Sequence, residues 1–159
     1  MIKAASLSPC GRYRWSLERR WGENPPLTFV MLNPSTADAD ADDPTIRRCI
    51  NFARRDGFGA LTVVNLFALR ATNPKEIETA AAPTGGTKND EILKEVISKS
   101  ERTVCAWGGN VLARERAAWF FKRFSQYDLY CLGLTIYGAP RHPLYVKSDT
   151  PLRKFEGMI

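Results

Sequence analysis

The sequence lacks any sign of a membrane or export signal. No apolar run approaches the ~20 residues that a membrane-spanning helix needs. The first residues do not have the basic and then apolar layout of a signal peptide. We therefore expect a cytoplasmic protein with no membrane partner.

Motifs that mark common enzyme classes are also missing. There is no Gly-x-Ser-x-Gly, no His-Glu-x-x-His and no cysteine with a convincing base partner, which disfavours hydrolases built on those devices. The Walker lysine motif and the full dinucleotide fingerprint are absent, which disfavours ATP-dependent and NAD-dependent enzymes. None of the four cysteines lies in a Cys-x-x-Cys pair, and the acidic run 38–43 lacks the glycine and glutamate of a calcium loop. We expect no cofactor and no metal site.

The length and net charge of the chain are compatible with a single folded domain that binds a polyanion. A length of 159 residues suits one domain with a substantial core, so residues 1–159 are predicted to form a single α/β domain. The formal net charge of +6 is compatible with a polyanionic partner such as nucleic acid.

Strand-like and helix-like segments alternate along the chain. Short apolar runs at 28–32, 61–67, 103–107 and 129–132 predict buried strands, and the segments between them have helical periodicity. Asp43 and Pro44 form a good helix start, as N-cap and first helical residue. This order predicts a three-layer α/β/α fold with a central, mainly parallel four-stranded sheet. Period-two alternation at 12–19, between turns, predicts an additional N-terminal β-hairpin.

Polar or flexible residues follow each predicted strand. In sequence order they are Asn33, Pro34 and Ser35; Asn65, leading to Arg70; Gly108, Gly109 and Asn110; and Arg141 and His142. Because the carboxyl ends of parallel strands meet at one edge of a sheet, these residues predict a ligand site there.

Some of these residues suggest specific chemistry. Asn65 interrupts an apolar strand, and its amide offers a donor and an acceptor to a ligand such as a nucleobase. Gly108 and Gly109 precede a predicted helix, where free N–H groups suit an anion such as phosphate. His142 lies in a predicted loop, where an imidazole can stabilise a developing negative charge, and Asp38 could activate water because it is close to Asn33 in sequence.

Two resemblances follow from these residues. The segments 31–38, 43–49, 64–67, 105–108 and 142–146 resemble the signature of an uncharacterised bacterial and phage family, a domain of unknown function, over nearly the whole chain. More distantly, Asn33-Pro34, Asn65, Ala106-Trp107-Gly108 and His142-Pro143-Leu144 are similar to motifs of the uracil-DNA glycosylase superfamily.

The second resemblance implies a role for each matching residue. Asn33 would orient water with help from Asp38, Asn65 would read the base, and His142 would stabilise the departing base. The remaining expected substrate-binding residues are Ser35, Gly108, Gly109 and Arg141 for phosphates, Leu144 or Tyr145 to fill the vacated base stack, Phe67 for stacking, and Pro34 and Arg70 beside them.

The function that this resemblance implies is binding of a nucleobase or nucleotide, with hydrolysis of an N-glycosidic bond in DNA as its chemistry. Two alternatives stay open at this point. One is a non-catalytic accessory protein that binds nucleic acid. The other is an enzyme that acts on free nucleotides.

Overall fold

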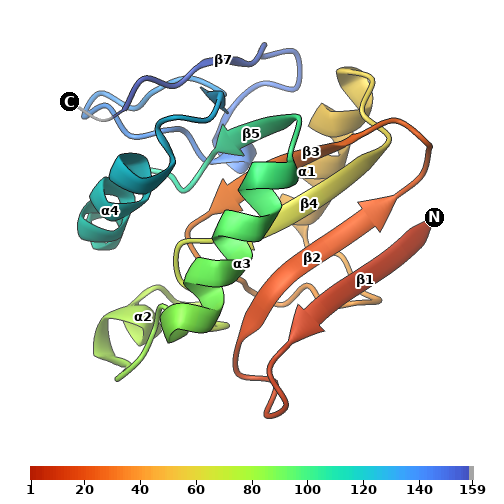
Figure 1. Cartoon of the computed structure of the whole chain (residues 1–159). Coiled ribbons are helices and arrows are strands. Elements are labelled where there is room, and N and C mark those ends of the chain that lie inside the picture. Colours follow the sequence, from red (N-terminus) through yellow and green to blue (C-terminus); the bar gives the residue numbers. More distant parts are fainter. Residues whose placement is uncertain (158–159) are drawn as a thin grey trace.

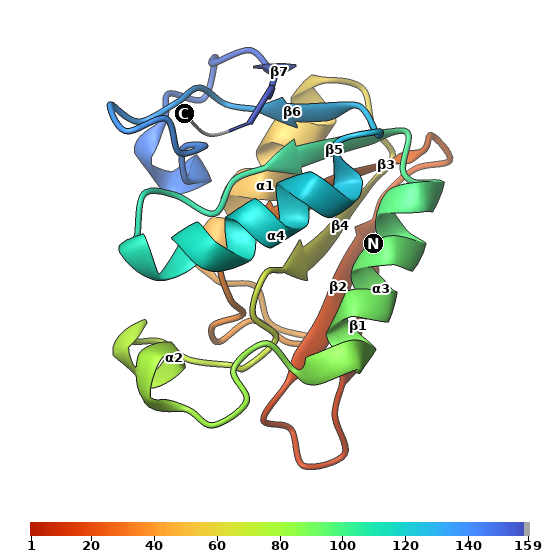
Figure 2. The same cartoon turned by 60° about the vertical axis from the view of Figure 1, so that its left-hand side comes forward.

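Residues 1–157 are described here from a computed structural model, and they form one seven-stranded sheet with helices on both faces (Figures 1 and 2). The strands are β1 (Ile2–Leu7), β2 (Arg14–Arg20), β3 (Pro26–Met31), β4 (Ala60–Asn65), β5 (Arg102–Cys105), β6 (Leu129–Cys131) and β7 (Arg153–Lys154). The helices are α1 (Pro44–Arg55), α2 (Lys75–Thr79), α3 (Gly86–Lys99) and α4 (Arg114–Phe124), with short 3-10 helices η1 (Val111–Ala113) and η2 (Pro143–Tyr145).

The sheet is mixed, in the order β1-β2-β4-β3-β5-β6-β7. Parallel pairings join β4 to β3, β3 to β5 and β5 to β6. Antiparallel pairings join β1 to β2, β2 to β4 and β6 to β7. The prediction of a mainly parallel four-stranded sheet is corrected accordingly. The predicted N-terminal hairpin is present as β1 and β2 and pairs with β4 at one edge of the sheet, and the short strand β7 is added at the opposite edge.

Helix α1 covers one face of the sheet and begins where the sequence predicts. Asp43 caps it, with Oδ1 accepting a hydrogen bond from the Ile46 N–H at 2.8 Å, and Pro44 occupies the first turn. Its buried side chains pack with Phe29, Val63 and Val104 from the central strands. Burial of this apolar stripe fixes α1 beside the carboxyl ends of β3 and β4.

Helices α3 and α4 cover the other face. Phe120 and Phe124 of α4 and Leu93 and Ile97 of α3 pack with Val64 and other strand residues in a second core cluster. The sequence predicts Ile92 and Val96 on the buried stripe of α3, but they are only half-buried. The stripe is rotated toward Leu93 and the fully buried Asn89.

The loop after β4 agrees with expectation, and the loop after β5 differs from it in detail. The long loop after β4 holds the five-residue helix α2, within the segment 74–82 where the sequence allows a short helix. The helical pattern at 88–100 corresponds to α3, which begins two residues earlier. Gly108 and Gly109 do not open an α-helix directly. The 3-10 helix η1 comes first, and its cap is Asn110, whose Oδ1 accepts from the Leu112 N–H at 3.0 Å. Within residues 1–157 no helix has the length and apolar character needed to cross a bilayer.

Candidate functional site

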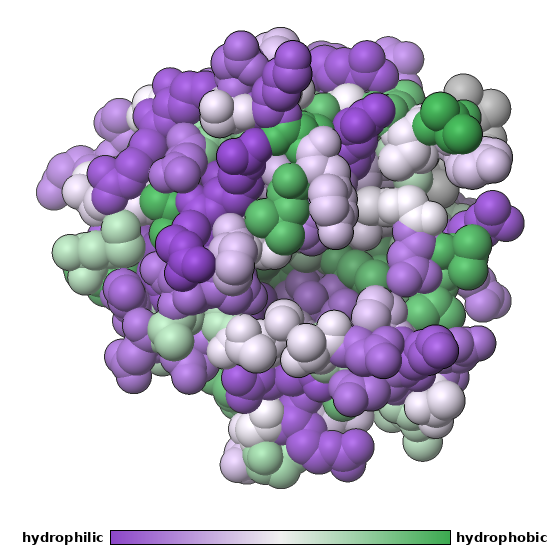
Figure 3. Space-filling model, turned by 180° about the vertical axis from the view of Figure 1, so that it is seen from behind, coloured by the Kyte–Doolittle hydropathy of each residue, from purple (hydrophilic) through white to green (hydrophobic). Residues whose placement is uncertain are grey.

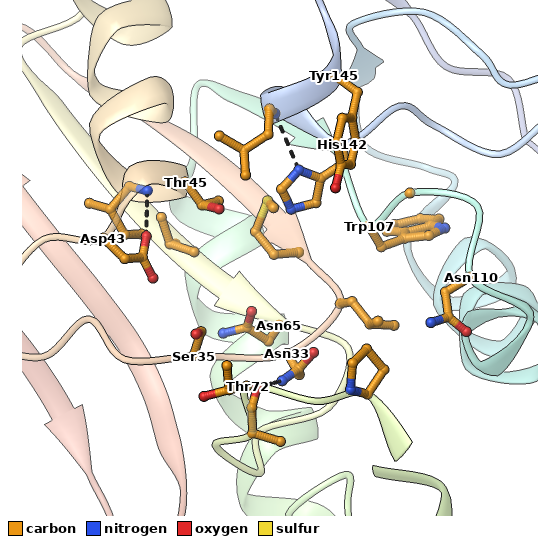
Figure 4. Close-up of a pocket in the computed structure, with 18 of the residues that line it drawn as sticks. Asn33, Ser35, Asp43, Thr45, Asn65, Thr72, Trp107, Asn110, His142 and Tyr145 are labelled. Atoms are coloured by element: carbon orange, nitrogen blue, oxygen red, sulfur yellow. Dashed lines mark hydrogen bonds between the residues drawn. The ribbon is translucent and has the colours of Figure 1, made fainter. Parts of the chain in front are cut away.

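A pocket of about 450 Å³ opens at the carboxyl ends of the parallel strands. Figure 3 shows it as a hollow with apolar side chains in its wall. It brings together residues from distant parts of the chain, including these predicted ones: Asn33, Ser35, Asn65, Gly108, Gly109, Arg141, His142, Leu144 and Tyr145. In Figure 4, Asn33 and Asn65 lie on one side of the pocket and His142 on the other.

Asn65 is the last residue of β4 and lies at the floor of this pocket. Its side chain is buried, and neither Oδ1 nor Nδ2 has a hydrogen-bond partner among residues 1–157. Leaving a buried amide unpaired costs roughly 1–3 kcal/mol. The neighbouring backbone does not satisfy this side chain, so it is available to a ligand that presents a donor and an acceptor together.

Asn33 follows β3, and the Nδ2 group of its side-chain amide is engaged in two hydrogen bonds. Its Nδ2 donates to the carbonyl of Ala71 at 2.8 Å and to that of Pro34 at 2.9 Å. These two bonds fix the orientation of the side chain. Its Oδ1 receives no hydrogen bond from the described residues, so this oxygen can accept one from water or from a ligand.

His142 is held by its neighbours in a defined tautomer. Its Nδ1 accepts a hydrogen bond from the Leu144 N–H at 3.2 Å, so the proton of the neutral ring is on Nε2. Burial lowers the pKa of His142 below its usual value, against an opposing effect of the Asp43 carboxylate. Helix α1 supports this loop, because Arg48 Nε donates to the carbonyl of Pro143 at 3.2 Å. The imidazole therefore presents a neutral N–H donor.

The glycine pair is placed differently from the predicted anion site. The Gly108 N–H donates to the carbonyl of Pro140 at 2.9 Å and is therefore not free for phosphate. Gly108 has a φ of +81°, and a Cβ there would lie 3.4 Å from the Cβ of His142. The contact distance alone would admit a side chain, so it is the positive φ of this turn that favours glycine at position 108.

Four predicted site residues do not line the pocket. Asp38 Oδ1 accepts from the N–H groups of Asp40 and Ala41, at 2.9 and 2.8 Å, and this turn keeps the carboxylate within its own loop. These bonds also lower the pKa of Asp38. Phe67 is packed into the core beneath α3 and α4 and cannot stack on a ligand there. Pro34 contributes its carbonyl to Asn33, and Arg70 lies in an adjoining groove that shares Ser35 and Thr72 with the pocket.

Several lining residues have no role in the site that the sequence predicts, and three of these are charged or aromatic. Asp43 was recognised only as a helix cap, although it also lines the pocket. Arg14 was placed only in a strand with one wet face, yet it is 2% exposed and lines the pocket. Trp107 forms part of the wall, where its ring is held edge-on by Phe120 and Phe155. Strand β2 also contains Ser16, Glu18, Arg19 and Arg20, so its sequence holds no signal that singles out Arg14.

Large apolar side chains are exposed around the mouth of the pocket. Leu144 and Tyr145 are 41% and 78% exposed and line the pocket itself. Val111 and Tyr137 line a second groove that shares Gly108 and Gly109 with the pocket, and Arg114 lies there too. Exposed apolar residues gathered at a pocket mouth usually mark a contact surface.

The described part of the chain, residues 1–157, contains no group of three or more His, Cys, Asp or Glu side chains arranged to hold a metal ion. Its four cysteines are all free thiols, and three of them are buried. The polar groups that line the pocket are amides, hydroxyls, an indole, an imidazole, two guanidinium groups and one carboxylate.

Comparison with known proteins gives a family and no close relative. Neither the curated proteins nor the solved structures contain a match. Residues 14–144 match the family described as "Protein of unknown function (DUF1643)". The match covers most of the chain and includes every pocket-lining residue except Tyr145. The chain therefore belongs to the DUF1643 family.

Proposed function

We propose that this protein binds a nucleobase in the pocket and hydrolyses the N-glycosidic bond that joins the base to a sugar in DNA, in the manner of the uracil-DNA glycosylases that its motifs resemble. The observation that carries the proposal is the unpaired amide of Asn65, buried at the floor of a pocket that also holds Asn33 and His142. A flat heterocycle with adjacent donor and acceptor groups satisfies such an amide.

The reaction needs only groups that line the pocket. Asn33 Oδ1 accepts a hydrogen bond from a water molecule and holds it for attack on the anomeric carbon of the sugar. The carbon–nitrogen bond breaks, and its electron pair leaves with the base. The His142 Nε2–H stabilises the resulting negative charge by hydrogen bonding to a base carbonyl. The water oxygen bonds to the sugar, and the proton that it loses balances the one that the departing base takes up.

DNA is favoured as the carrier of the base by the surroundings of the pocket. Leu144 and Tyr145 are exposed at its mouth, where a side chain can fill the gap left by an extruded base. Arg141 lines the pocket, and Arg114 lines the groove that also holds Val111 and Tyr137. Both side chains can contact phosphates there. The net charge of +6 also favours a polyanion.

The test is release of a free base from duplexes that contain uracil, a damaged base or a hypermodified base. We expect Asn33→Ala and His142→Asn each to slow release by roughly 100-fold or more, as for other positioned acid–base or oxyanion-stabilising groups. Glu78→Gln, on the exposed surface of α2, is the control and should release base at the wild-type rate.

Absence of base release from every duplex, together with no effect of Asn33→Ala on binding, would overturn the proposal. Salt-sensitive DNA binding that survives loss of both Asn33 and Asn65 would support an accessory protein instead. Stabilisation by free nucleotides alone, with no binding of DNA, would support an enzyme of free nucleotides.

A further inference from the structure

Arg14, at the start of β2, is a buried cation that lines the pocket. Its Nη1 donates to the carbonyl of Ala37 at 2.9 Å, which anchors the loop after β3. Its Nε is buried and has no hydrogen-bond partner in the described part of the chain. Among residues 1–157 no carboxylate oxygen lies within 4.0 Å of the guanidinium.

Arg19, on the same strand, shows how a buried arginine is normally accommodated. It is fully buried, and its Nε donates to Asp42 Oδ1 at 2.7 Å. Its Nη atoms donate to backbone carbonyls, including that of Asp38 at 2.6 Å. The same acidic loop thus neutralises Arg19 and leaves Arg14 without an anion.

The charges of Asp43 and Asp38 favour the charged form of Arg14, but neither carboxylate is close enough to form an ion pair with it. Asp38 has its Oδ1 bonded to backbone N–H groups, and Asp43 has its Oδ1 bonded to the first turn of α1. Burial lowers the pKa of Arg14 to about 10, so the group still carries its charge at neutral pH. The pocket lining as a whole contains two arginines, Arg14 and Arg141, against one aspartate, Asp43.

A buried, unpaired guanidinium is costly, and an anionic partner recovers most of that cost through charge-assisted hydrogen bonds. We propose that the Arg14 end of the pocket is an oxyanion subsite, and that the ligand carries a carboxylate or phosphate group which accepts a hydrogen bond from Arg14. This rests on the proposed function, since it assumes that the rest of the ligand is a nucleobase.

The depth of Arg14 decides where that group is attached. With 2% exposure, the guanidinium is out of reach of phosphates that pass over the mouth of the pocket. The oxyanion therefore enters with the base, which favours a nucleobase that bears a carboxylate. A mononucleotide that enters phosphate first shares the same chemistry and is distinguished by the experiment.

The experiment measures the affinity of the full chain for matched ligands by calorimetry. Orotate and orotamide differ only in carboxylate against carboxamide, and uracil lacks both groups. Uridine monophosphate and uridine form the second pair. We expect the wild type to prefer orotate to orotamide by roughly tenfold or more, and Arg14→Gln to remove that preference. If the wild type shows a preference only in the second pair, for uridine monophosphate over uridine, and Arg14→Gln removes it, the subsite is assigned to a phosphate.

Arg12→Gln is the matched control, because Arg12 is two residues away, exposed and outside this pocket. It should keep the preference for the anionic ligand. Arg14→Lys retains the positive charge and should keep part of the preference for the anionic ligand. This variant controls for the loss of the hydrogen bond to the Ala37 carbonyl in Arg14→Gln. Equal binding of both members of each pair by the wild type would overturn the subsite while leaving the nucleobase pocket standing. Failure of every ring to bind would overturn the proposed function and the subsite together.

Discussion

The N–H of Leu144 donates a hydrogen bond to Nδ1 of His142 at 3.2 Å. This bond decides which nitrogen of the imidazole carries the proton and turns Nε2–H toward the pocket (Figure 4). Protonation of Nδ1 would break it, because both partners would then be donors. The loop and the protonation state of the ring are therefore linked.

The first prediction concerns pH. Burial lowers the folded-state pKa of His142 below its usual 6.5, so below that pH the unfolded chain binds a proton that the folded chain does not. The contribution of His142 to the free energy of unfolding is therefore fully present above about pH 6.5, and it is lost as the pH falls toward the lowered pKa. Replacing His142 with Asn keeps a capping side chain for η2 but removes the titration.

The measurement is the melting temperature between about pH 8 and about pH 5, the range in which histidine titrates. We expect the wild type to lose more stability over this range than His142→Asn. A parallel decline in the two proteins would show that His142 does not report on folding.

The second prediction separates a ligand-binding amide from a structural one. Asn65→Leu replaces an unpaired buried amide with an apolar group, so the free energy of unfolding should stay the same or rise by up to about 1 kcal/mol. Binding of nucleobases should be lost. Asn89 is the matched control: it is also buried, but its Nδ2 donates to the carbonyl of Asn65 at 3.0 Å.

Asn89→Leu should lower the free energy of unfolding by about 1–3 kcal/mol, since it leaves a backbone carbonyl unpaired. Chemical denaturation measures both variants. If Asn65→Leu costs as much stability as Asn89→Leu, the Asn65 side chain supports the fold instead of the ligand.

The third prediction tests the rim of the pocket. Tyr145 is 78% exposed, so Tyr145→Ala should change the free energy of unfolding by less than about 0.5 kcal/mol. It should weaken binding of a uracil-containing duplex, measured by fluorescence anisotropy, and leave binding of the free base unchanged. Ile2→Ala, at a 69% exposed position on β1, is the control and should alter neither. Equal weakening of duplex and free base would place Tyr145 inside the base site.

The fourth prediction concerns the thiols. Burial raises the pKa of Cys49 and of Cys105, while a hydrogen bond with the Ser8 hydroxyl lowers the pKa of the exposed Cys10. Because the thiolate is the reactive form, Cys10 should react alone with Ellman's reagent in the native protein. The other three should react only after denaturation. Rapid native labelling of a second cysteine would contradict the packing described for the core.

Local patterns predicted the elements that depend on local chemistry. Asp43-Pro44 marked the start of α1 correctly, because capping is decided within a few residues. The strand endings also placed Asn33, Asn65 and His142 correctly enough to meet in one pocket. Strand β1 escaped detection because its residues are mostly exposed on both faces and show no clear apolar alternation.

The errors at the site have a different origin. Asp38 is five residues from Asn33 in sequence, but its own turn directs the carboxylate away, and sequence distance carries no information about that direction. Arg14 enters the pocket from β2, which precedes the other lining residues in sequence and joins them through its antiparallel pairing with β4 and the bond from Arg14 to Ala37. The position of Arg14 in the pocket depends on which strands pair in the folded sheet, and local sequence patterns do not determine that pairing.

Arg19 connects the outermost strand to the pocket wall. Its guanidinium donates to the carbonyl of Ala4 at 3.3 Å on one side and to the loop of Asp38 and Asp42 on the other. That loop leads into Asp43, a lining residue. Shortening the chain by its first few residues is therefore expected to disturb recognition at a distance, although none of those residues reaches the ligand.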